Sequence, residues 1–401
     1  MSRICFLLVC IFYVMNSEAQ IPNPDTIKKE NKHWYDIISI RGYAQLRYNR
    51  LLETNPNLKC EQCDKSIGEN GGFSFRRIRL VFSGNVNEHL YFYIQPDMAN
   101  VASGNNTHFF QLRDAYFDYA FDKDKTLRLR FGQSKIPFGF ENMQSSQNRL
   151  TLDRSDAINS ATPNERELGV FLYWANKEKR ALFKRLVDEG LKGSGDYGIL
   201  GIGIYNGSGT NKIENNNNLY TVARITYPFE VKSQIIEPGI QTYTGKYKIT
   251  ADQMSQGYDI QHTAEFIDQR IGATIVLYPK PLGIMAEYNI GKTPRFNTTK
   301  DTIESTTLHG LNITLSYLQR IKKCTFIPFI RYNYYNGGKK QELDARSYIV
   351  KDLEAGIEWQ INKSLECTVE YQWSDRQFLD HIKQNNHQKG GFLRIQTPFN
   401  F

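Results

Sequence analysis

The chain has 401 residues and a net charge of +8, from 50 Lys and Arg against 42 Asp and Glu. Its 24 Tyr and 24 Phe stand in a polar chain with a mean hydropathy of −0.52. Beyond the first residues, this polarity excludes a bundle of transmembrane helices, because each such helix needs about 20 apolar residues. It does not exclude spanning strands, which need about 10 residues each and turn only alternate ones to lipid.

The N-terminus has the three-part pattern of a secretory signal peptide. Arg3 precedes an apolar run at residues 4–15, and small residues follow at Ser17 and Ala19. Twelve apolar residues are too few to cross a bilayer, so we expect export and cleavage after Ala19. An exported basic chain is not expected to bind nucleic acid, and its charge suits the attraction of anions. We therefore divide the chain into a signal peptide (1–19), a lead-in segment (20–36) and a single domain (37–401).

From residue 38 to the end, apolar and polar side chains alternate. Side chains two apart share one face of a strand, so each run has one apolar and one polar face. About sixteen such runs follow one another. This pattern predicts an all-β, antiparallel up-and-down transmembrane barrel of about 16 strands. Clear examples are Ile78, Leu80 and Phe82 between Arg77, Arg79, Val81 and Ser83, and Leu127, Leu129 and Phe131 around Arg128 and Arg130.

The connections between these runs differ in length. Short turns alternating with long polar loops are typical of outer-membrane barrels, with the turns in the periplasm. Residues 178–191 come closest to a helical pattern, and we expect a short helical turn in a loop there. The expected turns are 84–88, 122–125, 279–281 and 361–363, and the expected long loops are 50–72, 99–109, 134–165, 176–195, 247–268, 292–307 and 374–390.

Four cysteines remain after the signal peptide. Cys60 and Cys63 form a C-x-x-C in a polar stretch, whereas Cys324 and Cys367 lie in strand-like runs. In an exported chain the close pair favours a small loop disulfide over free thiols or a metal site, because a metal site needs more ligands. We expect neither a metal nor another cofactor.

The last run ends in an aromatic residue. Leu393, Ile395, Phe399 and Phe401 share one face. A final strand that ends in Phe resembles the signal read by the barrel-assembly machinery of outer membranes, so we expect that machinery to bind Phe401.

Several short motifs resemble the phosphate-selective porin O/P family. They occur in the family's order from about residue 38 to residue 401, so that the resemblance covers nearly all of the mature chain. The motifs are 75–80 (FRRIRL), 112–116 (LRDAY), 132–139 (GQSKIPFG), 165–170 (ERELGV), 281–283 (PLG), 286–288 (AEY) and 291–292 (GK).

The resemblance implies a homotrimeric barrel of sixteen strands in the outer membrane, in contact with its lipid. It also implies a long third loop, here residues 133–165, that folds inward and narrows the pore. Arginines and lysines would line the channel and pass small anions along it. The residues that we expect to line the pore are Arg41, Arg47, Arg76, Arg77, Arg79, Arg128, Arg130 and Lys135.

The transported solute stays open. Residues 133–165 mix basic and acidic side chains, so a phosphate channel, another anion-preferring channel and a general porin for small hydrophilic solutes all remain. A guanidinium suits oxyanions because it stays charged and presents a rigid fork of donors. Alternatively, an arginine inside the barrel pairs with an acid such as Asp114 or Asp118 and only braces the wall.

Two other classes of protein remain as alternatives. One is an outer-membrane barrel hydrolase, but the chain has no G-x-S-x-G or H-E-x-x-H motif. The other is a soluble secreted β-sandwich, which would need no detergent.

Overall fold

A computed structural model of the chain describes residues 33–52, 71–99, 109–258 and 265–401. The expected signal peptide and the pair Cys60 and Cys63 lie outside these residues. Cys324 and Cys367 are described, and both are free and half-buried. The barrel described below belongs to the compact unit Ile37–Phe401.

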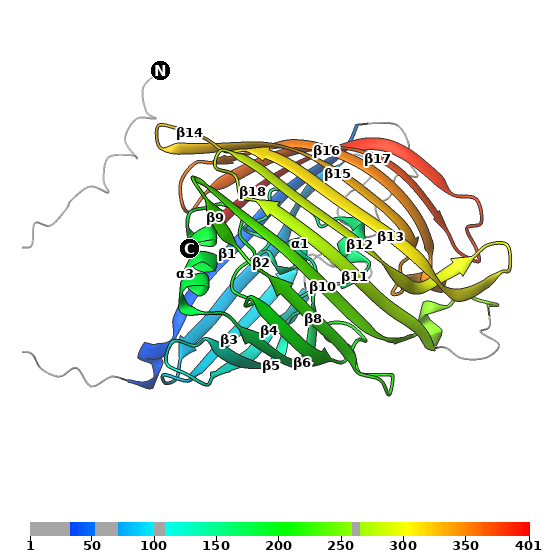
Figure 1. The fold of residues 1–401 in the computed structure, drawn as a ribbon. Coiled ribbons are helices and arrows are strands. Elements are labelled where there is room, and N and C mark those ends of the chain that lie inside the picture. Colours follow the sequence, from blue (N-terminus) through cyan, green and yellow to red (C-terminus); the bar gives the residue numbers. More distant parts are fainter. Residues whose placement is uncertain (1–32, 53–70, 100–108, 259–264) are drawn as a thin grey trace, which may run out of the picture. The chain divides into compact units, whose positions relative to one another are not determined.

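The fold is a closed antiparallel barrel (Figure 1). Each strand pairs with its neighbour in the chain, and β1 pairs with β18 to close the ring. Two short strands continue a longer one, since β9 follows β8 beside β10 and β14 follows β13 beside β15. The 18 strands therefore make 16 crossings, which confirms the predicted number.

The strands, in chain order, are β1 (Ser39–Leu51), β2 (Gly72–Asn85), β3 (Leu90–Ala99), β4 (Phe109–Ala120), β5 (Leu127–Lys135), β6 (Arg166–Trp174), β7 (Leu200–Tyr205), β8 (Tyr220–Thr226), β9 (Phe229–Val231), β10 (Gln234–Lys248), β11 (Glu265–Leu277), β12 (Leu282–Asn297), β13 (Thr302–Tyr317), β14 (Gln319–Ile321), β15 (Cys324–Gly338), β16 (Ser347–Gln360), β17 (Glu366–Leu379) and β18 (His387–Asn400). The helices are α1 (Phe140–Met143), α2 (Asp156–Asn159) and α3 (Lys177–Asp188), with short 3-10 turns at η1 (Trp34–Ile37), η2 (Ala251–Gln253) and η3 (Leu343–Ala345). No helix among the described residues is long and apolar enough to span a membrane.

The period-two pattern has the predicted meaning. In β11, Ile267, Ile271 and Ile275 are 45%, 54% and 51% exposed, whereas Asp268 and Arg270 between them are 0% and 2% exposed. Apolar side chains therefore point outward, toward lipid, and polar side chains point into the barrel.

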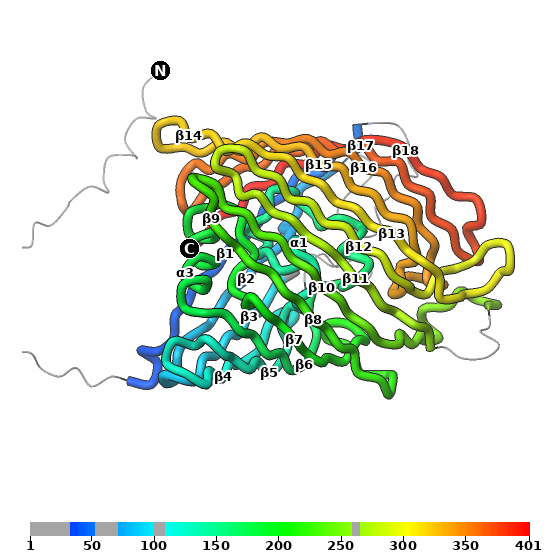
Figure 2. The backbone as a smooth tube through the Cα atoms, viewed as in Figure 1, coloured from blue at the N-terminus to red at the C-terminus, as the bar shows by residue number. Residues whose placement is uncertain are grey.

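The hairpin turns gather at one end of the barrel, which we call the turn end. Tight connections at 86–89, 278–281 and 361–365 lie where the sequence predicted turns. In outer-membrane barrels this end faces the periplasm. The same end holds the C-terminus and helix α3 (Figure 2).

Two predicted long loops are mostly strand. β12 continues to Asn297 and β13 begins at Thr302, and β17 and β18 likewise extend through most of 374–390. Polar residues outside the lipid still form the backbone hydrogen bonds that pair neighbouring strands. Loss of the apolar face therefore marks where a strand leaves the membrane, not where the strand ends.

The prediction for residues 176–195, a long loop with a short helical turn, is also wrong about the length of the helix and about the end of the barrel at which the connection lies. This long connection joins β6 to β7 at the turn end, among the tight turns, and it contains α3, a helix of 12 residues. The Asn176 side chain caps the helix by accepting a hydrogen bond from Lys179 N at 2.9 Å. Its buried face includes Leu182 and Leu186, so tertiary packing stabilises a helix whose sequence pattern is weak.

The barrel closes on its last residue. Phe401 N donates to Gly42 O at 2.9 Å, and Gly42 N donates to Phe401 O at 2.8 Å. A Cβ atom at residue 42 would lie 2.5 Å from the Phe401 ring and 2.8 Å from the carbonyl oxygen of Arg79. Only glycine fits between this ring and the backbone of β2.

We predict that Gly42→Ala and Phe401→Ser each lower the yield of folded barrel. The first introduces a steric overlap of the kind that costs about 1–3 kcal/mol, and the second removes the ring that covers the seam. Gel mobility before and after boiling measures the folded fraction. Gly72→Ala is the control, because a Cβ atom there meets nothing within 4 Å. Equal folded yields for Gly42→Ala and Gly72→Ala would contradict the seam's importance.

Candidate functional site

Residues 136–165, which we call the inner loop, cross the inside of the barrel. Asp153 accepts from Arg47 of β1 at 2.9 Å, and Glu141 accepts from Arg331 of β15 at 2.6 Å. Arg270 of β11 donates to the carbonyl oxygen of Ala157 at 2.9 Å on a third side. These strands lie around the ring, so the loop contacts the lumen wall on three sides.

An aromatic wall holds one side of the inner loop. Phe138 is fully buried against inward-facing rings of β6 to β10, among them Phe171, Tyr220 and Tyr243. The rings of Phe138 and Tyr243 meet edge to face at 4.9 Å. This packing is the interior of a protein rather than a water-filled channel, so solutes must pass elsewhere.

A cluster of opposite charges holds another side. Asp153 of the inner loop lies 2.9 Å from Arg47, 3.5 Å from Arg76 and 3.1 Å from Arg394. Burial would raise the pKa of the Asp153 carboxyl, but Arg47 and Arg394 outweigh burial and hold the pKa well below its usual range. Asp153 therefore stays ionised and ties the loop to β1, β2 and β18.

Two β-bulges increase the number of charges inside the barrel. One interrupts the pairing of β1 with β2 opposite Arg76, and the other interrupts β3 with β4 at Arg113. A bulge shifts the alternation by one residue, so two consecutive side chains face the same way. Arg76 and Arg77 both point inward, and so do Arg113 and Asp114, as their partners inside the barrel show.

Glu165 at the end of the inner loop is surrounded by cations. It lies 3.6 Å from Lys135, 3.6 Å from Arg149, 3.2 Å from Arg154 and 3.9 Å from Arg113, and it also pairs with Arg166. Burial would raise the pKa of the Glu165 carboxyl, but Lys135, Arg166 and the other cations hold the pKa well below its usual range.

We call Glu165, the cations around it and the charged side chains next to them the basic cluster. Arg77 and Arg79 extend the cluster along β2, where Arg76, Arg79 and Arg149 all repel Arg77. Seven positive charges stand against three negative ones, a net charge of +4. The cluster comprises Arg77, Arg79, Arg113, Lys135, Arg149, Arg154 and Arg166 with Asp97, Asp114 and Glu165.

Of the predicted pore-lining residues, Arg77, Arg79 and Lys135 belong to this cluster. Arg77 donates to the Gln45 side chain at 2.8 Å, and Arg79 lies 2.9 Å from Asp97. Lys135 Nζ donates to the carbonyl oxygen of Asn142 at 2.8 Å. Their role in the solute pathway stays a prediction.

The other predicted residues are not members of the basic cluster, although Arg76 is a neighbour of Arg77. Arg47 and Arg76 bind Asp153, as described above. Arg130 forms a two-pronged pair with Asp118 at 2.7 and 2.9 Å, and Arg128 binds Asp196 at 2.8 Å. Arg41 is exposed near the turn end, with its guanidinium 6.0 Å from the ring centre of Tyr93. Arg130 thus fits the alternative of a wall brace best.

The sequence pattern did not predict that Arg113 points into the lumen or that several basic side chains surround Glu165. Arg113 breaks the alternation with Asp114, and the bulge that resolves this conflict is not visible in the pattern. The sequence shows Arg149 and Arg154 among the mixed basic and acidic residues of 133–165, but not that they form one cluster with Arg166. A run of two charged residues inside an alternating strand was the available signal.

Comparison with known proteins agrees with this geometry. The family model of the phosphate-selective porins O and P matches residues 58–401. The chain belongs to this family. It is therefore an outer-membrane porin, and its function is the passage of small solutes rather than catalysis. A comparison with curated protein sequences gave no match.

Solved porin structures share the barrel. The outer membrane channel DcaP of Acinetobacter baumannii (13% identity) and OmpF of Salmonella typhi in complex with daunomycin (16% identity) both have TM-scores of 0.57, covering 91% of this porin and 97% of the other chain. The anion-selective porin from Comamonas acidovorans has a TM-score of 0.50 at 9% identity, covering 91% of this porin and 99% of that chain. At these identities the likeness shows the fold alone.

We predict that Asp153→Asn destabilises the porin by about 3–5 kcal/mol, because the buried Arg47 and Arg394 and the half-buried Arg76 lose the carboxylate that they share. The transition midpoint in guanidinium chloride, followed by tryptophan fluorescence, measures the change. Asp188→Asn is the control, since its exposed pair with Lys184 contributes about 0.5 kcal/mol or less. Equal midpoints for the two variants would mean that Asp153 does not anchor the loop.

Proposed function

We propose that this porin prefers anions and that the basic cluster causes the preference. The observation that carries the proposal is the net charge of +4 among side chains that are mostly buried inside the barrel. Fixed charge of one sign inside a barrel raises the local concentration of the opposite ion. Passing anions would therefore outnumber cations on the side of β2 to β6.

The chemistry of the cluster suits oxyanions. The Nε atoms of Arg79, Arg113 and Arg149 are buried and make no hydrogen bond within the described part of the chain. A guanidinium donates well to carboxylate or phosphate oxygens, and several moderate sites in series allow an ion to enter and also to leave. Phosphate is one candidate solute among such anions.

On the opposite side of the lumen, the described residues carry no equal excess of negative charge. Its wall carboxylates are mostly paired with arginines, as Glu354 is with Arg331 at 2.5 Å and Glu370 is with Arg394 at 3.4 Å. Paired charges largely cancel at a distance. The charge asymmetry across the lumen thus favours anions.

A general, weakly selective porin is the second candidate. The observation that favours it is the complete pairing of Arg130 with Asp118, which shows that arginines inside this barrel also serve as braces. If every cation of the basic cluster were neutralised in the same way, the porin would discriminate by size alone.

We also propose the assembly that the family resemblance implies, a homotrimer in the outer membrane. Recognition of Phe401 by the barrel-assembly machinery belongs to the same proposal. Its support is the exposed ring of Phe401 at the end of β18, which the machinery could reach before the seam with Gly42 closes.

We predict that the variant Arg77→Gln with Arg149→Gln shifts the reversal potential in a KCl gradient toward cations. The shift should be larger at low salt, since the Debye length falls from about 10 Å at 0.1 M to about 3 Å at 1 M. Planar-bilayer recordings at two ionic strengths measure it. Neither arginine binds a carboxylate by a hydrogen bond in the described residues, so we expect the barrel to fold.

The matched control is Arg320→Gln with Lys323→Gln. It removes the same charge from exposed positions at the turn end, outside the lumen. If both double variants keep the wild-type reversal potential, the basic cluster does not select ions. If the wild type prefers cations, the anion proposal fails and the general porin stands. Block of the chloride current by added phosphate would distinguish an oxyanion site from simple attraction.

A further inference from the structure

The connection between β6 and β7 differs from every other connection at the turn end among the described residues. Those others are tight turns such as 232–233 and 322–323, whereas this one occupies residues 175–199. A long segment at the end with short turns needs a physical role, because a hairpin would join β6 to β7 as well.

The first half of the segment, which contains α3, packs against the inner face of the barrel wall at the turn end. Leu182 and Leu186 of α3 pack with Ile235, Val276 and Tyr278 of the barrel. Ile235 and Val276 belong to the buried, inward-facing side of β10 and β11. The helix therefore lies against the inner side of the barrel at its turn end.

The second half, residues 190–198, crosses the lumen, and we call it the strap. At one end Asp196 accepts from Arg128 of β5 at 2.8 Å. At the other end Lys192 pairs with Glu358 of β16 at 2.5 Å. Between β5 and β16 lie eight crossings of the ring on one side and six on the other, so the two anchors stand on opposite walls.

The backbone of the strap is too short to cross the lumen by itself, and it is held in an unfavourable conformation at Lys192. Four steps of extended chain from Lys192 to Asp196 span at most about 14 Å, so the long side chains at both ends complete the crossing. Lys192 adopts a left-handed backbone with φ of 66° and is 8% exposed. A lysine keeps this unfavourable conformation only where its surroundings hold it.

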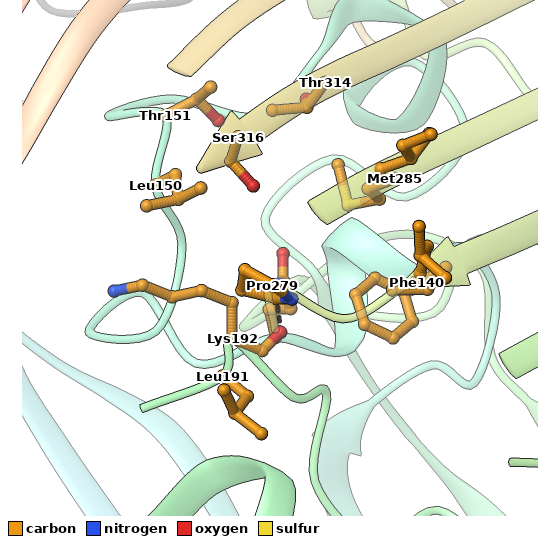
Figure 3. A pocket seen from close by; sticks show the side chains of 13 residues that line it. Phe140, Leu150, Thr151, Leu191, Lys192, Pro279, Met285, Thr314 and Ser316 are labelled. Atoms are coloured by element: carbon orange, nitrogen blue, oxygen red, sulfur yellow. Dashed lines mark hydrogen bonds between the residues drawn. The ribbon is translucent and has the colours of Figure 1, made fainter. Parts of the chain in front are cut away.

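The strap also contacts the inner loop above it. The Gln144 side chain donates to the carbonyl oxygen of Lys192 at 2.6 Å. Between the two layers lies a small cavity of about 40 Å³, bounded by Leu150 and Thr151 of the loop and by Leu191 and Lys192 of the strap (Figure 3). The strap and the inner loop therefore form two consecutive layers across this part of the lumen.

We propose that the strap is a second constriction of this porin, held across the lumen by the Lys192–Glu358 ion pair. It limits the size of solutes that pass from the inner loop toward the periplasm. The proposal rests on the channel function of the family and is independent of the preference for anions.

The test uses full-length porin in planar bilayers and in liposomes that swell with sugars of increasing size. Lys192→Met and Glu358→Gln each remove one partner and free the strap at one end. We expect each to raise single-channel conductance by about twofold or more and to admit larger sugars, because the narrowest cross-section limits both. The charge-swapped double variant, Lys192→Glu with Glu358→Lys, should return both values toward the wild type.

Two further variants guard against a failure to fold. Gln144→Ala removes only the contact with the inner loop and should raise the conductance in the same direction, by a smaller factor. Lys323→Met, in an exposed turn, is the matched control for Lys192→Met and should leave both values unchanged. Mobility on gels before and after boiling confirms that each variant is folded.

Wild-type conductance and size limit in folded Lys192→Met, Glu358→Gln and Gln144→Ala porin would overturn the proposal and leave the strap as a brace. The reversal potential, recorded in the same experiment, tests the anion preference separately. Variants with a wider pore and an unchanged ion preference support the second constriction and say nothing against the anion proposal. Variants with an unchanged pore in a porin that prefers anions reject the second constriction and leave the anion proposal standing.

Discussion

The constraint on which the structure depends is that every backbone donor and acceptor in the bilayer needs a partner within the protein. The pairing of β1 with β18, completed by Gly42 and Phe401, removes the last open edge. Closure then decides the place of every side chain, since alternate residues must face either lipid or lumen. The polar half of each strand is enclosed in a space that the chain itself has to fill or leave open to solutes.

Enclosed charges need partners, and this need explains how the inner loop is held. Asp153 and Glu165 bring negative charge to arginines that the strands alone leave crowded together. Removing one partner of a buried pair costs far more than the pair itself contributes to stability. The loop and the wall therefore depend on each other, and an arginine can brace the fold and shape the field in the lumen at the same time.

The lumen is divided into sides with different chemistry. Rings from β6 to β10 pack against Phe138 and form a buried hydrophobic cluster there. The basic cluster occupies β2 to β6 and the inner loop, and paired charges occupy β15 to β18. At the turn end, α3 and the strap add a second layer below the inner loop. Passage of a solute is thus governed by two layers in series, of which the upper bears most of the unbalanced charge.

The sequence by itself determined the barrel, the number of crossings and the inward direction of residues such as Arg79 and Arg130, because strand periodicity is a local property. Its motifs also indicated the family. Only the tertiary structure decided that Arg113 joins the cluster through a bulge, that Arg130 is tied to Asp118, and that residues 175–199 enter the lumen. Each of these depends on partners far away in the chain. The periodicity of a strand shows that two arginines both point inward. It does not show which of them pairs with a carboxylate on the next strand and which lies beside other cations.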